Sequence, residues 1–166
     1  NGYHFISICP TNGKGFNENK VTWLENELKI ANDDTPDKPI FVLEHHPVLN
    51  TVYGSFGDPS GITDLRDTLF KYHNVVNMTG HSHFSIMDPR SLYQGEITAI
   101  NTGSISYPDN AINELRHYGV FPVDQFGRYR FSGTDFLPGS EAQIVEVYDD
   151  GAMDIIGLDV YNDRQV

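Results

Sequence analysis

The sequence is poor in cysteine, in basic residues and in long apolar runs, and each shortage excludes a class of protein. One cysteine among 166 residues excludes an internal disulfide framework. The 11 Lys and Arg against 23 Asp and Glu give a net charge of −12, which argues against non-specific binding to nucleic acid or anionic membranes. No apolar run approaches the roughly 20 residues that span a bilayer. What remains, 39% hydrophobic and 20% charged residues, is typical of one globular domain.

The chain opens on a strand-like segment without a methionine or a polar leader. We therefore expect residues 1–166 to be a piece of a longer protein. The cellular location is unknown from this sequence, because its start gives no targeting signal to interpret.

Apolar patterning in residues 1–105 alternates between strand and helix. Short β-prone runs predict strands, and helical spacing of apolar residues predicts helices, over the following ranges: strands at 3–9, 40–43, 74–78 and 97–101, helices at 17–32 and 59–72. In the first helix Val21, Leu24 and Leu28 form the apolar stripe, which Trp23 and Ile30 widen. Alternating helices and strands indicate an α/β sheet with parallel strands.

The last third of the chain has a different character. Residues 107–139 are rich in aromatics, glycine and proline, and we expect an irregular insertion or long loop there. Two further strands are predicted at 143–148 and 153–160, because Asp149-Asp150-Gly151 between them is a hairpin signal. Cys9 is expected to be a buried strand residue.

Histidines follow two of the predicted strands directly. His45 comes after the strand at 40–43, and His81 and His83 come after the strand at 74–78. Because ligands bind at the carboxyl ends of strands in open α/β sheets, we expect these imidazoles to converge. Imidazole is a good ligand for transition metals at neutral pH, so the pattern favours a metal site over an ordinary polar surface. Beyond Gly80, His81 and His83 can address two different ions.

These residues also carry a resemblance to a known family. The segments are Phe-Val-Leu-Glu-His-His-Pro at 41–47, Thr-Gly-His-Ser-His-Phe at 79–84 and Ile-Asn-Thr-Gly-Ser at 100–104. Together they resemble the C-terminal half of a calcineurin-like metallophosphoesterase, as do the apolar start of the chain and Val-Thr-Trp-Leu-Glu-Asn-Glu-Leu at 21–28.

The resemblance implies half of a four-layer α/β/β/α sandwich, a mixed sheet with flanking helices and a C-terminal β-hairpin. It also implies two transition-metal ions (Mn, Fe or Zn) in the complete enzyme, one bound by His45 and His81 and the other by His83. The family's Asp-x-His and Gly-Asn-His motifs are absent, and Gly57-Asp58 comes too late in the chain order to supply the bridging carboxylate. We therefore expect the C-terminal part of one catalytic domain, inactive by itself, with weak metal binding or none.

The activity that the resemblance implies is hydrolysis of a phosphoester, either a monoester or a diester, by a metal-bridging hydroxide. His46, Tyr53, Asn101 and Ser104 are candidates for contacts with the substrate or with the metal ligands, although a turn or packing role explains each of them too. A half-sandwich leaves one sheet face uncovered, and we expect that face to bind the missing N-terminal half or a second copy of the chain. The alternative function is a non-catalytic interaction module.

Overall fold

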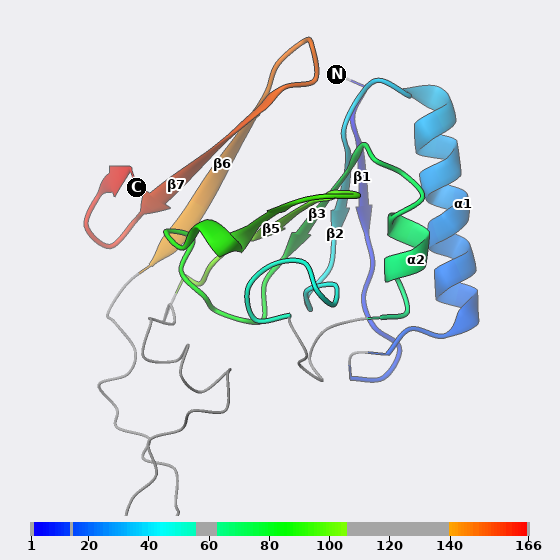
Figure 1. The fold of residues 1–166 in the computed structure, drawn as a ribbon, viewed down its shortest axis with the longest axis horizontal. Helices are drawn as coiled ribbons and strands as arrows, with labels where there is room; N and C mark the ends of the chain where they lie inside the picture. The colour runs from blue at the N-terminus through cyan, green and yellow to red at the C-terminus, as the bar shows by residue number, and fades with distance from the viewer. Residues whose placement is uncertain (1, 14, 56–62, 106–139, 166) are drawn as a thin grey trace, which may run out of the picture.

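The computed structural model of the chain describes residues 2–13, 15–55, 63–105 and 140–165. Within them the chain forms a five-stranded mixed sheet and a separate three-stranded antiparallel sheet (Figure 1). The order of the first sheet is β1-β2-β3-β5-β4, with these bounds: β1 His4–Ser7, β2 Ile40–Leu43, β3 Val75–Thr79, β4 Leu92–Gln94 and β5 Thr98–Asn101. The second sheet has the order β6-β7-β8, with bounds β6 Glu141–Val147, β7 Met153–Asp159 and β8 Arg164–Gln165.

The central strands β2 and β3 are parallel and almost completely buried. The continuous apolar sequence of β2 suits a strand that is covered on both faces. β3 also buries Asn77, whose amide donates to the Val42 carbonyl at 3.2 Å. β1, β2, β3 and β5 run parallel, so their carboxyl ends lie at one edge of the sheet. β4, which the sequence did not predict, follows a 3₁₀ turn at Pro89–Ser91 and pairs antiparallel with β5, so the sheet is mixed.

Helix α1 (Glu18–Asp34) confirms the first predicted helix and begins at a side-chain cap. The Asn17 carboxamide oxygen accepts a hydrogen bond from the Lys20 backbone N–H at 3.0 Å. Leu24 and Leu28 are fully buried in the core. The wider stripe was wrong, because Trp23 is 43% exposed and Ile30 is 59% exposed on the outer side of the helix.

Helix α2 spans only Arg66–Leu69, which is shorter than predicted. Leu65 and Leu69 are buried as expected, but residues 63–65 are not helical. The Asp64 carboxylate accepts a hydrogen bond from the Phe16 backbone N–H at 2.9 Å. Residues 63–65 therefore bind the segment before α1 instead of extending α2. Residues 59–62 of the predicted helix, like the predicted insertion at 107–139, lie outside the described residues.

The two faces of the five-stranded sheet are covered by different layers. The helices pack against one face, through a core that includes Leu24, Leu28, Leu65 and Leu69. On the other face Phe41, Val76 and Ile100 pack against side chains of the hairpin β6–β7, which lies across the sheet from α1 in Figure 1. On this same face Phe5 of β1 stacks on Phe41 and is 68% exposed, so the hairpin leaves the β1 end of the central sheet open to solvent.

Alternation along the hairpin separates its two faces. Val145 and Ile155 contact the central sheet, whereas the cross-strand pair Ile144 and Ile156 lies on the outer face, where Ile144 is 46% exposed. One smaller expectation was wrong: Cys9 is exposed, because β1 ends at Ser7. No helix in the described segments has the length and apolarity needed to cross a membrane.

Candidate metal centre

The loops that follow β2, β3 and β5 are joined by backbone hydrogen bonds just beyond the sheet. The Gly80 N–H donates to the His45 carbonyl at 3.1 Å, which links the loop after β2 to the loop after β3. The Thr102 N–H and hydroxyl both donate to the Thr79 carbonyl, at 2.8 and 3.0 Å, which links the loop after β5 to the same place. These hydrogen bonds continue the pairing of the parallel strands into the loops that contain the histidines.

The loop after β2, residues 44–55, is held mainly by burial. Pro47 is buried, and Val48 and Val52 are fully buried in the core that the helices cover. The buried hydroxyls of Thr51 and Ser55 donate to backbone carbonyls within the same loop, at 2.6 Å each. Proline also restricts the residue before it to extended backbone, which limits the conformations open to His46.

Three imidazoles meet above this edge of the sheet. One ring nitrogen each from His45, His46 and His81 lies within 4.8 Å of the others. The ring centroids are 5.2 Å apart for His45 and His81, 4.9 Å for His45 and His46, and 4.2 Å for His46 and His81. His45 and His81 are exposed and His46 is partly buried, so the cluster is open to solvent. The expected convergence of His45 and His81 is present.

His83 is not part of this cluster. It lies in the same loop after β3, and its backbone has φ of 57°, while His81 has φ of 62°. This left-handed conformation costs roughly 1–2 kcal/mol for a residue with a Cβ. The positive φ values lie on the two histidines themselves and not on the neighbouring Gly80. A role for His83 at a second ion stays a prediction.

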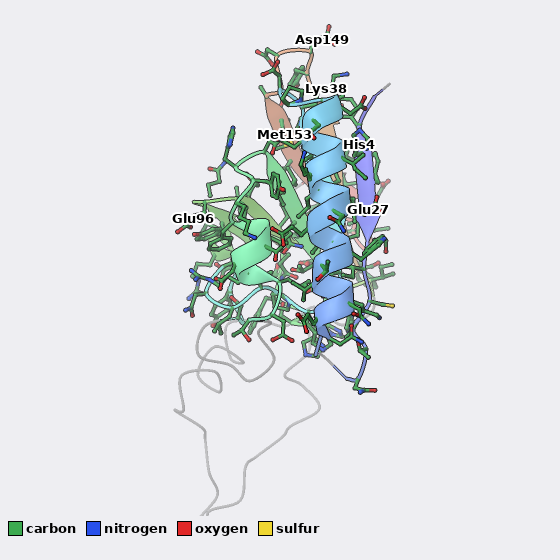
Figure 2. All side chains as sticks on the ribbon, turned by 90° about the vertical axis from the view of Figure 1, so that its right-hand side faces the viewer. His4, Glu27, Lys38, Glu96, Asp149 and Met153 are labelled. Atoms are coloured by element: carbon green, nitrogen blue, oxygen red, sulfur yellow. The ribbon has the colours of Figure 1, made fainter. Side chains whose placement is uncertain are left out.

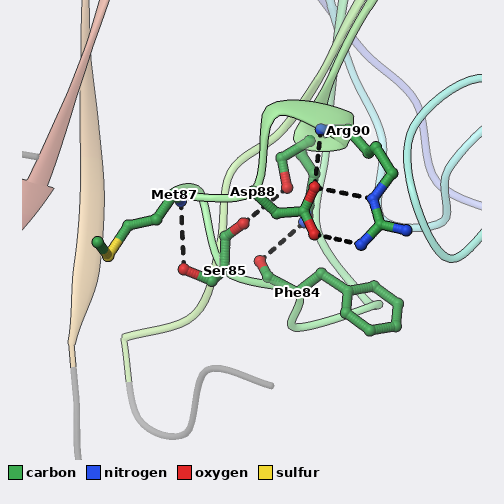
Figure 3. Close-up of polar contacts among 7 residues, drawn as sticks. Phe84, Ser85, Met87, Asp88 and Arg90 are labelled. Atoms are coloured by element: carbon green, nitrogen blue, oxygen red, sulfur yellow. Dashed lines mark hydrogen bonds and ion pairs between the residues drawn. The ribbon is translucent and has the colours of Figure 1, made fainter. Parts of the chain in front are cut away.

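Polar contacts from β5 and from within the segment itself hold this strained loop (Figure 3). The Asn101 amide donates to the Phe84 carbonyl at 2.9 Å, and the Ser91 hydroxyl donates to the Ser85 carbonyl at 2.8 Å. Asp88 accepts hydrogen bonds from the Arg90 guanidinium at 2.9 and 2.6 Å, and this ion pair lowers the pKa of its carboxyl.

Glu141, the first residue of β6, fixes the same loop from the other sheet. Its carboxylate accepts from the Ser85 hydroxyl at 2.6 Å and from the Ile86 N–H at 3.0 Å. Its own N–H donates to the Ser104 carbonyl at 2.9 Å. Gly103 has φ of 73°, and a Cβ there would lie 2.8 Å from a Glu141 carboxylate oxygen, so this junction requires glycine.

The remaining candidates from the sequence, Tyr53, Asn101 and Ser104, lie in and around these loops. Tyr53 is buried, with its ring 4.1 Å from the Phe84 ring and the Arg90 guanidinium 3.9 Å from its own ring, an arrangement typical of packing. Asn101 is fully buried and serves the loop after β3. Ser104 is partly buried and its carbonyl accepts from Glu141. A contact of these residues with substrate stays a prediction.

Glu44 is a buried carboxyl at the base of the histidine cluster. Burial raises its pKa from the usual 4.5 to about 8, and the backbone N–H groups of His46 and His45 offset this only in part. Neither carboxyl oxygen makes a well-formed hydrogen bond within the segments that the structure describes. Burial thus favours the neutral form of this carboxyl, which directly precedes His45 in the chain.

The donor atoms of the cluster decide which ions suit it. Neutral imidazole nitrogens bind Zn²⁺, Cu²⁺, Ni²⁺ and Fe, whereas Mg²⁺ and Ca²⁺ prefer oxygen ligands. No carboxylate joins the three histidines among the residues that the structure describes. Two cations held close together need an anionic ligand between them to offset their repulsion. The cluster therefore fits one transition-metal ion and lacks the donors for a pair.

A separate pocket lies at the opposite end of the parallel strands. Its volume is about 410 Å³, and its lining includes Lys38, His73 and Asp150. Figure 2 shows Lys38 and Met153, another lining residue, near the hairpin turn at Asp149. The amino ends of β2, β3 and β5 contribute to this pocket, so it is remote from the histidine cluster.

Sequence reasoning missed three features of this region. His46 was assigned a secondary role, although the double histidine before Pro47 was a visible signal of its membership. Glu44 precedes the motif directly, but its burial depends on the loop that folds over it. The partners of the Glu141 carboxylate, Ser85 and Ile86, are 56 and 55 residues away in the chain, and the sequence around Glu141 carries no signal of these contacts.

A scan against protein-family models finds no matching family, and searches of curated proteins and of solved structures find no match either.

Proposed function

We propose that this chain carries part of the metal centre of a phosphoester hydrolase, with the remaining ligands supplied by another segment. The observation that supports this most strongly is the meeting of His45 and His81, which are 36 residues apart in the sequence. They follow neighbouring parallel strands, where α/β enzymes place their ligands. The phosphoester class rests on the resemblance of the three loop motifs to calcineurin-like metallophosphoesterases.

The residues of this chain would serve the reaction by holding the ion and shaping its surroundings. His45 and His81 provide neutral nitrogen ligands, and the loop after β2 fixes His45 through the burial of Val48. A bound metal lowers the pKa of a water to near neutrality and offsets charge on the phosphoryl oxygens. The chain has a net charge of −12, so an anionic phosphoester would be repelled by the protein alone.

The test is a hydrolysis assay on a version of the protein that is extended upstream of residue 1 by about 100 residues, a length within the usual range for a domain. We expect metal-dependent cleavage of p-nitrophenyl phosphate or bis-p-nitrophenyl phosphate, assayed with added Mn²⁺ and with added Zn²⁺. His81→Ala should abolish it, and His73→Ala, which changes a histidine at the opposite end of the strands, should not. Activity that survives chelation or His81→Ala would refute the metal mechanism.

A non-catalytic interaction module is the second candidate, and the outer face of the hairpin favours it. Ile144 and Ile156 are paired there in a region that also includes the partly exposed Leu158. Light scattering of the isolated chain distinguishes the two outcomes: a dimer that Ile144→Asp converts to a monomer supports an interaction role. A monomer that binds no hydrophobic dye would refute it.

A further inference from the structure

We infer that His46 is a third metal ligand, and that His45, His46 and His81 together bind one Zn²⁺-like ion. The resemblance assigns only His45 and His81 to a shared ion, so this assignment deepens the proposed function at the same site. It rests on the ring geometry and does not require that the protein hydrolyse phosphoesters.

The positions of the rings carry the assignment. The shortest of the three ring separations is between His46 and His81, at 4.2 Å, and the separation expected from the resemblance is the longest, at 5.2 Å. Any ion placed between His45 and His81 therefore lies beside the His46 ring. One ring nitrogen of each histidine lies within 4.8 Å of the other two. To bind one Zn²⁺, these nitrogens must approach one another to about 3.3 Å, the separation that Zn–N bonds of 2.0–2.1 Å at tetrahedral angles require.

The backbone explains why two consecutive residues can point to one ion. In a strand, His45 and His46 would face opposite sides of the sheet. Here β2 ends at Leu43, and residues 45 and 46 form a bend that is followed by the buried Pro47. The loop is anchored on both sides, by β2 and by Val48, and its two imidazoles lie above the sheet edge. The exposed rings of His45 and His81 retain room to adjust.

The donor set also selects the ion. Three neutral imidazoles with an open fourth position are typical of catalytic zinc sites. Affinity of nitrogen sites rises from Mn²⁺ through Co²⁺ and Ni²⁺ to Cu²⁺, with Zn²⁺ also strong. We therefore expect one Zn²⁺ or Co²⁺ per chain and much weaker Mn²⁺ binding. This replaces the sequence-based expectation of weak metal binding, which counted two histidines at the shared ion.

The experiment is a Co²⁺ titration of the metal-free 166-residue chain, followed by visible absorption and by displacement with Zn²⁺. We expect one Co²⁺ per chain with the intense bands of a four-coordinate site. His46→Ala should weaken binding by more than about tenfold, because loss of even an outer partner of a ligand costs 10–100-fold. His73→Ala, which changes a histidine at the opposite end of the parallel strands, is the matched control and should leave the affinity unchanged.

Two further measurements keep the assignment open to refutation. Far-UV circular dichroism and the melting temperature of metal-free His46→Ala show whether it is folded, and His46→Gln is a second variant. In the wild-type chain, imidazole ¹⁵N chemical shifts on adding Zn²⁺ report each ligand directly, and three rings should shift. If only His45 and His81 respond, His46 is not a ligand and the proposed function is unaffected. If no ring responds, the single-ion site is absent and hydrolysis by the extended chain still tests the proposed function.

Discussion

The loops after β2 and β3 present histidines to the same point, but they are built in different ways. The loop after β2 is packed into the core by Val48 and Val52, and the Thr51 and Ser55 hydroxyls donate to backbone carbonyls within it. The loop after β3 has left-handed backbone at His81 and His83. That loop is held in part by polar side chains from β5 and β6.

The difference has consequences for stability. Apolar burial contributes to global folding, so the loop after β2 should open only when the whole domain unfolds. Polar contacts that hold a strained loop can be lost locally, so the loop after β3 should open at lower free energy. Strain of this kind persists only where surrounding contacts over-determine it, and it occurs often at functional sites.

The largest effect is expected at Glu44, which lies at the base of the packed loop. Its pKa is about 8 in the folded protein against 4.5 ordinarily, so its contribution to stability is full below pH 4.5 and is lost as pH rises through about 8. At pH 9, Glu44→Gln should raise the free energy of unfolding by about 3 to 5 kcal/mol, at about 1.4 kcal/mol per pKa unit. At pH 4 the two proteins should have similar stability.

Urea unfolding of the metal-free protein at both pH values measures this effect, with a chelator present. Glu146→Gln, which removes a carboxyl at an exposed position, is the matched control for the change in charge. Equal stabilisation by Glu44→Gln at pH 4 and pH 9 would show that the Glu44 carboxyl is not buried as described.

Asn101 tests the polar side of the comparison. Asn101→Ala removes the amide that donates to the backbone carbonyl of the buried residue Phe84. It should lower the free energy of unfolding by about 1–3 kcal/mol, the penalty for leaving a buried acceptor unsatisfied. Hydrogen exchange should show faster opening of residues 81–91 and little change in residues 47–55. Asn26→Ala on the exposed side of α1 serves as the control and should stay within about 0.5 kcal/mol of wild type. Uniform acceleration of both loops would contradict the proposed difference between them.

The smallest change in stability is expected from substituting His83, and whether the substitution stabilises or destabilises the protein is the informative result. Because its φ is 57°, His83→Gly should relieve strain and stabilise the metal-free protein by up to about 1 kcal/mol. Ser82→Gly changes a neighbouring residue without left-handed φ and should destabilise it by about 0.4–1 kcal/mol through the unfolded chain. Thermal unfolding of both variants measures the difference, and destabilisation by His83→Gly would show that the strain is absent or that the ring contributes more than it costs.

The same contrast explains what sequence reasoning could and could not find. The strand at 40–43 was recognisable from its continuous apolar run between turn signals, and β2 matches its prediction residue for residue. The strand at 74–78 was recognisable as a short β-prone segment, and β3 lies one residue later, at Val75–Thr79. Parallel strand order then placed His45 near His81. The hairpin was recognisable from Asp149-Asp150-Gly151, although β6 begins two residues earlier than predicted.

The errors arose where tertiary contacts override local pattern. The second helix was predicted over 59–72, but Asp64 is used to bind the Phe16 backbone and α2 begins only at Arg66. β4 is three residues long and forms because β5 provides its partner, which a short window of sequence does not show. The contacts of Glu141 join the two sheets across more than 50 residues, and such contacts leave no local signal.

The most direct test of the central claim is anomalous diffraction from crystals of the chain grown with Zn²⁺. We predict a single strong peak within bonding distance, about 2.0–2.1 Å, of ring nitrogens from both His45 and His81. A peak bound elsewhere, or ring nitrogens of His45 and His81 too far apart to share one ion in the presence of saturating Zn²⁺, would contradict it.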